Sequence, residues 1–236
     1  MKKTVILLIM LISMAGLTAC VKDRADTSNA SVQDETEKIH EDVAAENIRY
    51  VNISGDARSI VIRQSENECF EFYNGDLDRD HTYKVFCDEN GDTIDINIMM
   101  ESAEDDNNIL GSVYVDIPQK EFEKIEVTGG FRQIFLCTVN SDVFIHADNA
   151  FVNLDLEAER LEHNITLEGS ESNAFTGVSV YFDKFPENVK MELNLIQGGT
   201  INDPQNMLKE GGLELGLGKP VISISNTKEI NIYGEE

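Results

Sequence analysis

Pairs of apolar residues recur at a constant step in the middle of the chain. The two members of each pair are two positions apart. Successive pairs begin nine residues apart, at Ile125, Ile134, Val143 and Val152. Apolar residues at every second position are typical of a β-strand with one buried face. Strands repeated at a fixed step, separated by Gly, Asn, Ser and Asp, predict a β-solenoid or a tightly wound β-sandwich.

The nine-residue step also aligns three residues of catalytic type. Cys137, His146 and Asp155 occupy equivalent positions in successive strands, and such residues can act as nucleophile, base and orienting group. If successive strands alternate between two sheets, residues 18 positions apart stack. Cys137 then lies over Asp155, and His146 lies on the other sheet. A hairpin does not assemble the three either, so we predict no catalytic triad.

The preceding segment, Ile48–Met99, contains short runs rich in β-branched and aromatic residues, separated by glycine-containing turns. Asn90-Gly91 favours a two-residue hairpin turn with positive φ at both positions. That turn would place Val85 opposite Ile96, and it predicts an antiparallel meander at the start of the domain. No segment after Glu46 has a sustained helical period. The predicted domain is therefore all-β.

The N-terminus predicts the location of the protein. Two lysines precede the apolar run Val5–Met14, which is shorter than the roughly 20 residues of a membrane-spanning helix and is typical of a secretory signal. Leu17–Cys20 (LTAC) resembles the bacterial lipobox. The resemblance implies removal of residues 1–19 and attachment of diacylglycerol and fatty acid to Cys20. We therefore expect an extracytoplasmic protein of the bacterial cell envelope that is lipid-anchored to a membrane.

A polar segment follows the predicted anchor. Residues 21–46 contain no aromatic residue, glycine or proline, so they cannot bury enough apolar surface to fold alone. Part of this segment, 34–46, has a marginal helical pattern that would need tertiary support. The predicted organisation is a signal peptide at 1–19, a lipidated N-terminus and tether at 20–46, and a β-domain at 47–236.

The charge of the chain limits its partners. There are 44 Asp and Glu against 19 Lys and Arg, a formal net charge of −25, which opposes contacts with nucleic acid. Glu101–Asn108 and Asp88–Asp92 hold oxygen ligands that calcium prefers. Neither has EF-hand spacing, and the four histidines have no metal-ligand spacing. We predict no nucleic-acid partner, no metal and no cofactor other than the covalent lipid.

Cys69 and Cys87 flank a second predicted hairpin, for which two registers fit. One register places the two cysteines opposite each other, as a disulfide requires. The other buries more apolar surface by matching Phe70 with Val85, and it puts the thiols on opposite faces. The sequence thus allows either a disulfide or two free thiols.

Phe135 and Phe144 lie on the polar side of the repeated strands. They either pack under a loop or neighbouring strand, or form a patch that binds a partner. They are the candidate binding residues of the domain.

Three motifs carry a resemblance to a known family. SVYVDIP at Ser112–Pro118, KIEV at Lys124–Val127 and PVISISNTKEINIY at Pro220–Tyr233 resemble the bacterial "putative adhesin" domains, which are related to the head domain of auto-transporter-like adhesins. The resemblance covers roughly Ile48–Tyr233. It implies a right-handed single-stranded β-helix with no established enzymatic site. An antiparallel β-sandwich is the alternative architecture.

These observations predict a non-catalytic, adhesin-like binding or structural domain whose partner is an unidentified protein or glycan. The early strands and the last strand, Glu229–Tyr233, are the candidate caps of the predicted solenoid. A second hypothesis is an extracytoplasmic sensor or an accessory subunit of an envelope complex. A polysaccharide-acting β-helix enzyme is disfavoured, because the sequence lacks the signs of a basic, aromatic-lined cleft.

Overall fold

The computed structural model describes residues 37–75, 83–100, 112–170, 172–205, 208 and 212–234. The predictions for the signal peptide, for Cys20 and for the acidic loop Glu101–Asn108 lie outside these ranges. The described part is all-β, with seventeen strands and one short 3-10 helix, Ala158–Arg160. In these ranges no helix has the length and apolar character needed to cross a bilayer.

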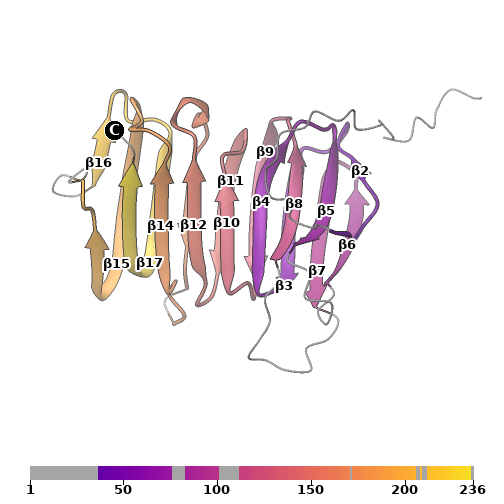
Figure 1. Cartoon of the computed structure of the whole chain (residues 1–236), viewed down its shortest axis with the longest axis horizontal. Helices are drawn as coiled ribbons and strands as arrows, with labels where there is room; N and C mark the ends of the chain where they lie inside the picture. Colours follow the sequence, from indigo (N-terminus) through magenta and orange to yellow (C-terminus); the bar gives the residue numbers. More distant parts are fainter. Residues whose placement is uncertain are drawn as a thin grey trace, which may run out of the picture. The chain divides into compact units, whose positions relative to one another are not determined.

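Most strands belong to two columns, A and B, that run along the horizontal axis of Figure 1. Column A contains, in spatial order, β6 (Tyr83–Asn90), β7 (Thr93–Met100), β3 (Tyr50–Asp56), β9 (Phe122–Gly129), β11 (Ser141–Ala147) and β13 (Ile165–Glu168). Column B contains β5 (Cys69–Gly75), β8 (Ser112–Pro118), β4 (Ser59–Ser65), β10 (Gln133–Cys137), β12 (Phe151–Leu156) and β14 (Gly177–Phe182). Two longer strands, β17 (Val221–Gly234) and β15 (Val189–Asn202), continue both columns.

Successive strands of the central region alternate between the columns, and neighbours within a column are parallel. Ile134 of β10 pairs with Val152 of β12, and the same 18-residue spacing relates β9 to β11. The predicted stacking of residues 18 positions apart is therefore confirmed at this point. The spacing grows to 22 residues between β11 and β13 and to 26 between β12 and β14. This parallel pairing rules out the antiparallel sandwich.

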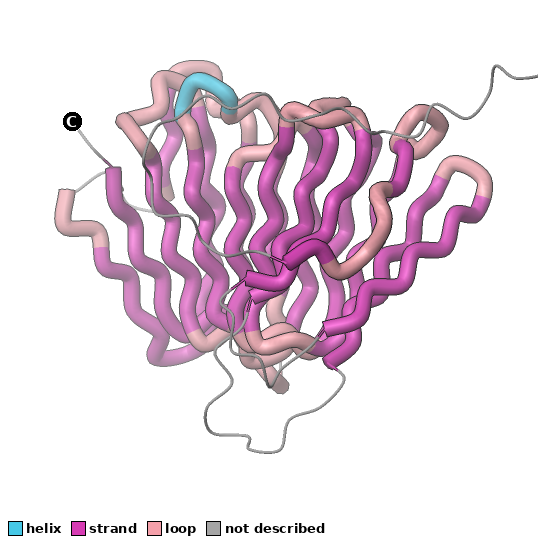
Figure 2. The backbone as a smooth tube through the Cα atoms, turned by 45° about the vertical axis from the view of Figure 1, so that its right-hand side comes forward, coloured by secondary structure: helices cyan, strands magenta, loops and turns pink. Residues whose placement is uncertain are grey.

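The hydrophobic core lies between the two columns. In β11, Val143 and Ile145 are buried while Phe144 and His146 point outward, as the alternation predicts. The inward-facing residues of both columns join one continuous cluster, and each fully buried aliphatic side chain contributes roughly 1.5–3 kcal/mol. The loops lie at the ends of the strands (Figure 2). The outward side chains thus form broad sheet faces.

Antiparallel strands bound the parallel coils at both ends. At one end β5 and β6 pair antiparallel with β8 and β7, and the other edge of β5 is covered by β1 (Glu37–Lys38) and β2 (Val43–Ala44). At the other end β16 (Leu213–Leu215) pairs antiparallel with β15. The prediction that the last strand is a cap was wrong, because β17 lies between β14 and β15.

The predicted antiparallel meander is wrong apart from one hairpin. β3 pairs with β7 and β9, and β4 pairs with β8 and β10, all in parallel. The β6–β7 hairpin is present, but Val85 faces Ile98. Its central residues are Gly91 and Asp92, and only Gly91 has positive φ, +69°. This pattern fits a type II′ turn instead of the predicted type I′.

The described end of the predicted tether is part of the domain. Residues 37–46 of the predicted tether contain the short strands β1 and β2, and the marginal helical pattern noted over 34–46 does not form a helix in this described part. The Lys120 ammonium, in the link from β8 to β9, donates to the carbonyl oxygens of Ala45, Glu46 and Ile48 at 2.6, 3.0 and 2.6 Å. The segment leading into β3 is therefore held in place before the predicted boundary at residue 47.

Two glycines pair where β3 and β9 end. Gly55 and Gly129 are neighbours in register, with φ of +136° and +134°. A Cβ atom on Gly129 would overlap the carbonyl oxygen of Gly55, and one on Gly55 would overlap that of Ile98. Glycine is needed at both positions for conformation and for space.

Candidate functional site

The outer face of column B aligns side chains from strands that are distant in sequence. Asp155 of β12 pairs with Tyr181 of β14, and Tyr181 pairs with Tyr233 of β17. Each of the three follows a buried residue that anchors its strand in the core: Leu154, Val180 and Ile232. Parallel pairing in register thus brings a carboxylate and two phenol rings into one row.

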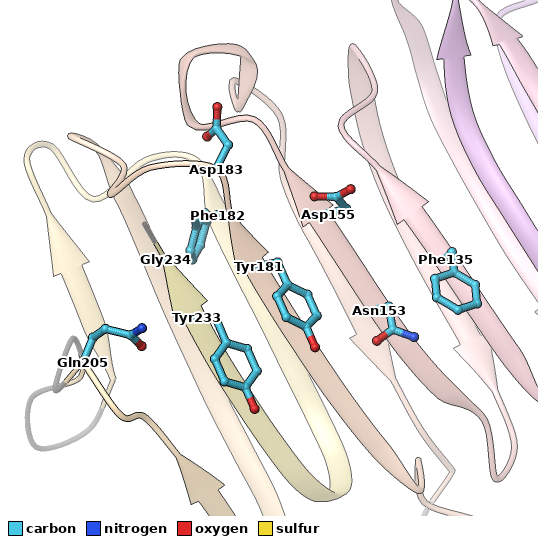
Figure 3. Close-up of a pocket in the computed structure, with 9 residues that line it drawn as sticks. All are labelled: Phe135, Asn153, Asp155, Tyr181, Phe182, Asp183, Gln205, Tyr233 and Gly234. Carbon is cyan, nitrogen blue, oxygen red and sulfur yellow. The ribbon is translucent and has the colours of Figure 1, made fainter. Parts of the chain in front are cut away.

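The two tyrosine rings stack on each other. Their centroids are 4.9 Å apart and their planes differ by 14°. Tyr181 is nevertheless 43% exposed, because its strand lies on the outer face of the sheet. The stacked pair (Figure 3) therefore presents an aromatic surface to solvent.

A groove with a volume of about 640 Å³ lies over this part of column B. It combines aromatic rings, two carboxylates and two amides. Its lining residues are Phe135, Asn153, Asp155, Tyr181, Phe182, Asp183, Gln205, Tyr233 and Gly234. Rings and polar groups that converge in a groove are typical of a ligand site.

Most polar groups of the groove have no partner among the residues that the structure describes. Asp183 is an exception, because its Oδ1 accepts hydrogen bonds from the backbone N–H groups of Ala158 at 2.7 Å and of Lys184 at 2.8 Å. Among the described residues, the side chains of Asn153 and Asp155 make no hydrogen bond or ion pair, in contrast to Asp183. They are available to a ligand.

A second hollow, of about 700 Å³, lies between the 3-10 helix and the loop before β17. Of its charged groups, Lys184 pairs with Glu159, whereas Glu162, Glu187 and Lys219 have no ion pair among the described residues. Leu217 at its border is 88% exposed. The groove on column B, which adds a stacked pair of rings to its polar groups, is the stronger candidate.

The two phenylalanines predicted as a binding patch lie apart. Phe135 of β10 lines the groove on column B. Phe144 lies on β11 in column A, where the Lys124 ammonium is 4.6 Å from its ring centroid. The two residues point outward from different columns and do not form one surface. Phe135 alone belongs to the groove, and Cys20 lies outside the described residues.

The structure separates the three residues of catalytic type as the 18-residue coil predicts. Cys137 pairs with Asp155 in column B, whereas His146 lies on β11 in column A. Burial, together with the nearby Asp155 carboxylate, raises the pKa of the Cys137 thiol above its ordinary value. The thiol therefore stays protonated at neutral pH, which removes its nucleophilic form.

The structure also decides between the two registers of the predicted second hairpin. β5 and β6 belong to different columns and do not pair, so neither register exists. Cys87 and Cys137 are free thiols, and no Cys69–Cys87 disulfide forms. Within the described ranges, including the turn at Asp88–Asp92, no group of three His, Cys, Asp or Glu side chains is placed to hold a metal ion.

Comparison with known proteins adds a shared fold. No family model and no curated protein matches the chain. The crystal structure of a "putative cell adhesion protein" from Clostridium sporogenes ATCC 15579 matches with a TM-score of 0.55 and 15% identity, over 85% of this chain and 99% of that one. A "putative adhesin" from Bacteroides fragilis NCTC 9343 covers 85% of this chain and 96% of its own, with a TM-score of 0.23 and 8% identity. The first match shows a common fold at this low identity.

Proposed function

We propose that this protein is an extracytoplasmic lipoprotein, anchored through Cys20, whose β-domain is a non-catalytic, adhesin-like binding module. The groove on column B is its contact surface. The observation that carries this proposal is the stacked pair of Tyr181 and Tyr233 beside the unpartnered Asp155 and Asn153. Side chains that converge on a sheet face are held by the core beneath them, which limits the entropy lost on binding.

The arrangement of the strands supports a β-solenoid as the scaffold of this module. Strands that alternate between two columns and pair in parallel at an 18-residue spacing fit the right-handed single-stranded β-helix that the sequence resemblance implies. The fold shared with the "putative cell adhesion protein" from Clostridium sporogenes supports a role in adhesion. The separation of His146 from Cys137 and Asp155 supports a role without catalysis.

The lipid anchor is tested by Cys20→Ala. We expect this variant to lose metabolic labelling with a radioactive fatty acid and to accumulate as uncleaved precursor, because the lipidated thiol is absent. Cys137→Ala, which removes a cysteine of the β-domain, should keep both labelling and cleavage. Label that persists in Cys20→Ala would refute the anchor.

The binding role is tested by adherence. Bacteria that display the protein should adhere to a panel of cell and matrix surfaces, and Tyr181→Ala should lower adherence at least tenfold because it removes half of the stacked aromatic surface. Phe144→Ala is the matched control, since Phe144 is an outward aromatic residue of column A and is 37% exposed. Equal adherence of all three proteins, at equal surface expression, would exclude the groove as the contact surface.

A further inference from the structure

We propose that the groove on column B binds an uncharged saccharide, which stacks on Tyr181 and places its hydroxyl groups on Asp155 and Asn153. This inference rests on the proposed binding role of the same groove and names the class of its ligand. It follows from the arrangement of the rings, the hydrogen-bonding groups and the charges that line the groove.

The first observation concerns the ring faces. Tyr181 lies between Asp155 and Tyr233 in the register of the sheet, and stacking covers the face that it turns toward Tyr233. The other face of the Tyr181 ring is directed toward β12, where Asn153 and Asp155 line the groove (Figure 3). A sugar ring has a flat apolar C–H face with hydroxyls at its rim. The sugar can bury that face on Tyr181 while its hydroxyl groups reach Asn153 and Asp155.

The second observation concerns hydrogen bonding. The Asp155 carboxylate is an acceptor, whereas Asn153 and Gln205 offer both donors and acceptors. None of these three side chains has a hydrogen-bond partner among the residues that the structure describes, although all three line the groove. Saccharide hydroxyls donate and accept in turn. A saccharide therefore matches the three polar groups of the groove that have no partner among the described residues.

The third observation is the charge of the lining. Asp155 and Asp183 line the groove, and among the residues that the structure describes no Lys, Arg or His lines it, in a chain with a formal charge of −25. Sialylated, uronic and phosphorylated glycans are therefore repelled. A cationic ligand would depend chiefly on Asp155, and an ion pair at such an exposed position contributes only about 0–1 kcal/mol. An uncharged saccharide uses the ring, the amides and the carboxylate together.

The size of the groove fits part of a glycan. Its volume of about 640 Å³ lies in the range of roughly 300–1,000 Å³ that is usual for small-molecule sites. Because the groove lies on the outer face of column B, a longer chain can continue past it. The expected ligand is thus a short uncharged segment of a larger glycan.

A glycan array with the full-length protein purified in detergent tests the inference. The array carries neutral hexose oligosaccharides, sialylated and uronic oligosaccharides, deacetylated chitosan oligosaccharides and poly-lysine. We expect binding to one or more neutral oligosaccharides and at least tenfold weaker binding to the anionic ones. Tyr181→Ala should weaken neutral binding at least tenfold, and Asp155→Asn should weaken it severalfold. Phe144→Ala should bind like the natural protein.

Both groove variants alter exposed side chains, so unchanged melting temperatures and circular dichroism will show that they fold. Binding restricted to chitosan or poly-lysine, or neutral binding that Tyr181→Ala leaves intact, would overturn the inference. If Tyr181→Ala abolishes cell adherence while no neutral oligosaccharide binds, the proposal of a saccharide ligand is refuted and the binding role of the groove stands. If Tyr181→Ala does not alter adherence, the groove is not the contact surface and its proposed binding role fails.

Discussion

The free thiol of Cys87 is half-buried on β6. Burial, with a smaller contribution from the Glu89 carboxylate, raises its pKa to about 12 from an ordinary value of 9.0. Above pH 9 the unfolded chain loses this proton while the folded protein keeps it. The folded state then binds more protons than the unfolded state, so stability must fall as pH rises from 9 toward 12.

This linkage predicts the behaviour of Cys87→Ala. The free energy of unfolding of the natural protein should fall more steeply between pH 9 and pH 11 than that of the variant, because the variant lacks the thiol. Guanidinium titrations at pH 8, 9, 10 and 11 measure both slopes. Other alkaline-titrating groups, including Tyr73 with its raised pKa, are common to the two proteins and cancel. Equal pH dependence of the unfolding free energy in the two proteins would contradict the raised pKa of Cys87.

At the residue scale, the sequence identified only part of the groove. Phe135 was predicted as an outward aromatic residue, and the 18-residue coil placed Asp155 beside Cys137. Tyr181 and Tyr233 were missed because the spacing becomes irregular after residue 156. Each is the second-last residue of its strand and follows a buried apolar residue, Val180 or Ile232, and this buried neighbour marks an outward position. It does not reveal that the two strands are neighbours.

At the element scale, the strands were predicted better than their pairings. Alternation identifies which face of a strand is buried, and it correctly predicted strands from β9 to β12. It does not identify the neighbouring strand, so β3 was expected to pair locally although its partner β9 lies about 70 residues away. Alternation also does not locate the hairpin turn. Moving the turn by one residue, from Asn90-Gly91 to Gly91-Asp92, shifts the pairing of β6 with β7 by only two residues.

The paired glycines at the ends of β3 and β9 allow a test of this architecture. Gly129→Ala should destabilise the protein by about 3 kcal/mol, because it adds the cost of positive φ to an overlap with the Gly55 carbonyl. Urea unfolding measures the loss. Gly198→Ala is the control, since its φ is also positive, +82°, but a Cβ atom there meets nothing within 4 Å. The control should lose only about 1 kcal/mol.

Equal losses in the two variants would show that backbone conformation alone determines the cost. A larger loss in Gly129→Ala would show that the close approach of β3 and β9 is maintained in solution. The comparison therefore tests the pairing of two strands that belong to the same column but are distant in the chain.

At the scale of the whole molecule, residues 37–46 belong to the domain. A protein that begins at Asn47 lacks β1 and β2, which cover the edge of β5, and the buried Ala45. Compared with a protein that begins at Glu37, it should melt roughly 5–10 °C lower, as expected for a loss of 2–3 kcal/mol in a domain of this size. The bare β5 edge should also promote self-association.

Scanning calorimetry and light scattering compare the two shortened proteins. Equal melting temperatures, with both proteins monomeric, would place the boundary where the sequence predicted it. A lower melting temperature for the shorter protein would show that Lys120 and β5 hold the chain in the way that the structure describes.

The position of β17 has a consequence for how such a protein can change in length. The last strand lies between β14 and β15, and the first complete coil, β3 with β4, lies between strands that follow it in sequence. The parallel coils are thus bounded by β5, β6 and β16, which pair antiparallel with them, and duplicated coils added before β3 or after β17 would find no free parallel edge. A longer descendant would have to gain its coils by internal insertion, between β9 and β14, where chain order and spatial order agree.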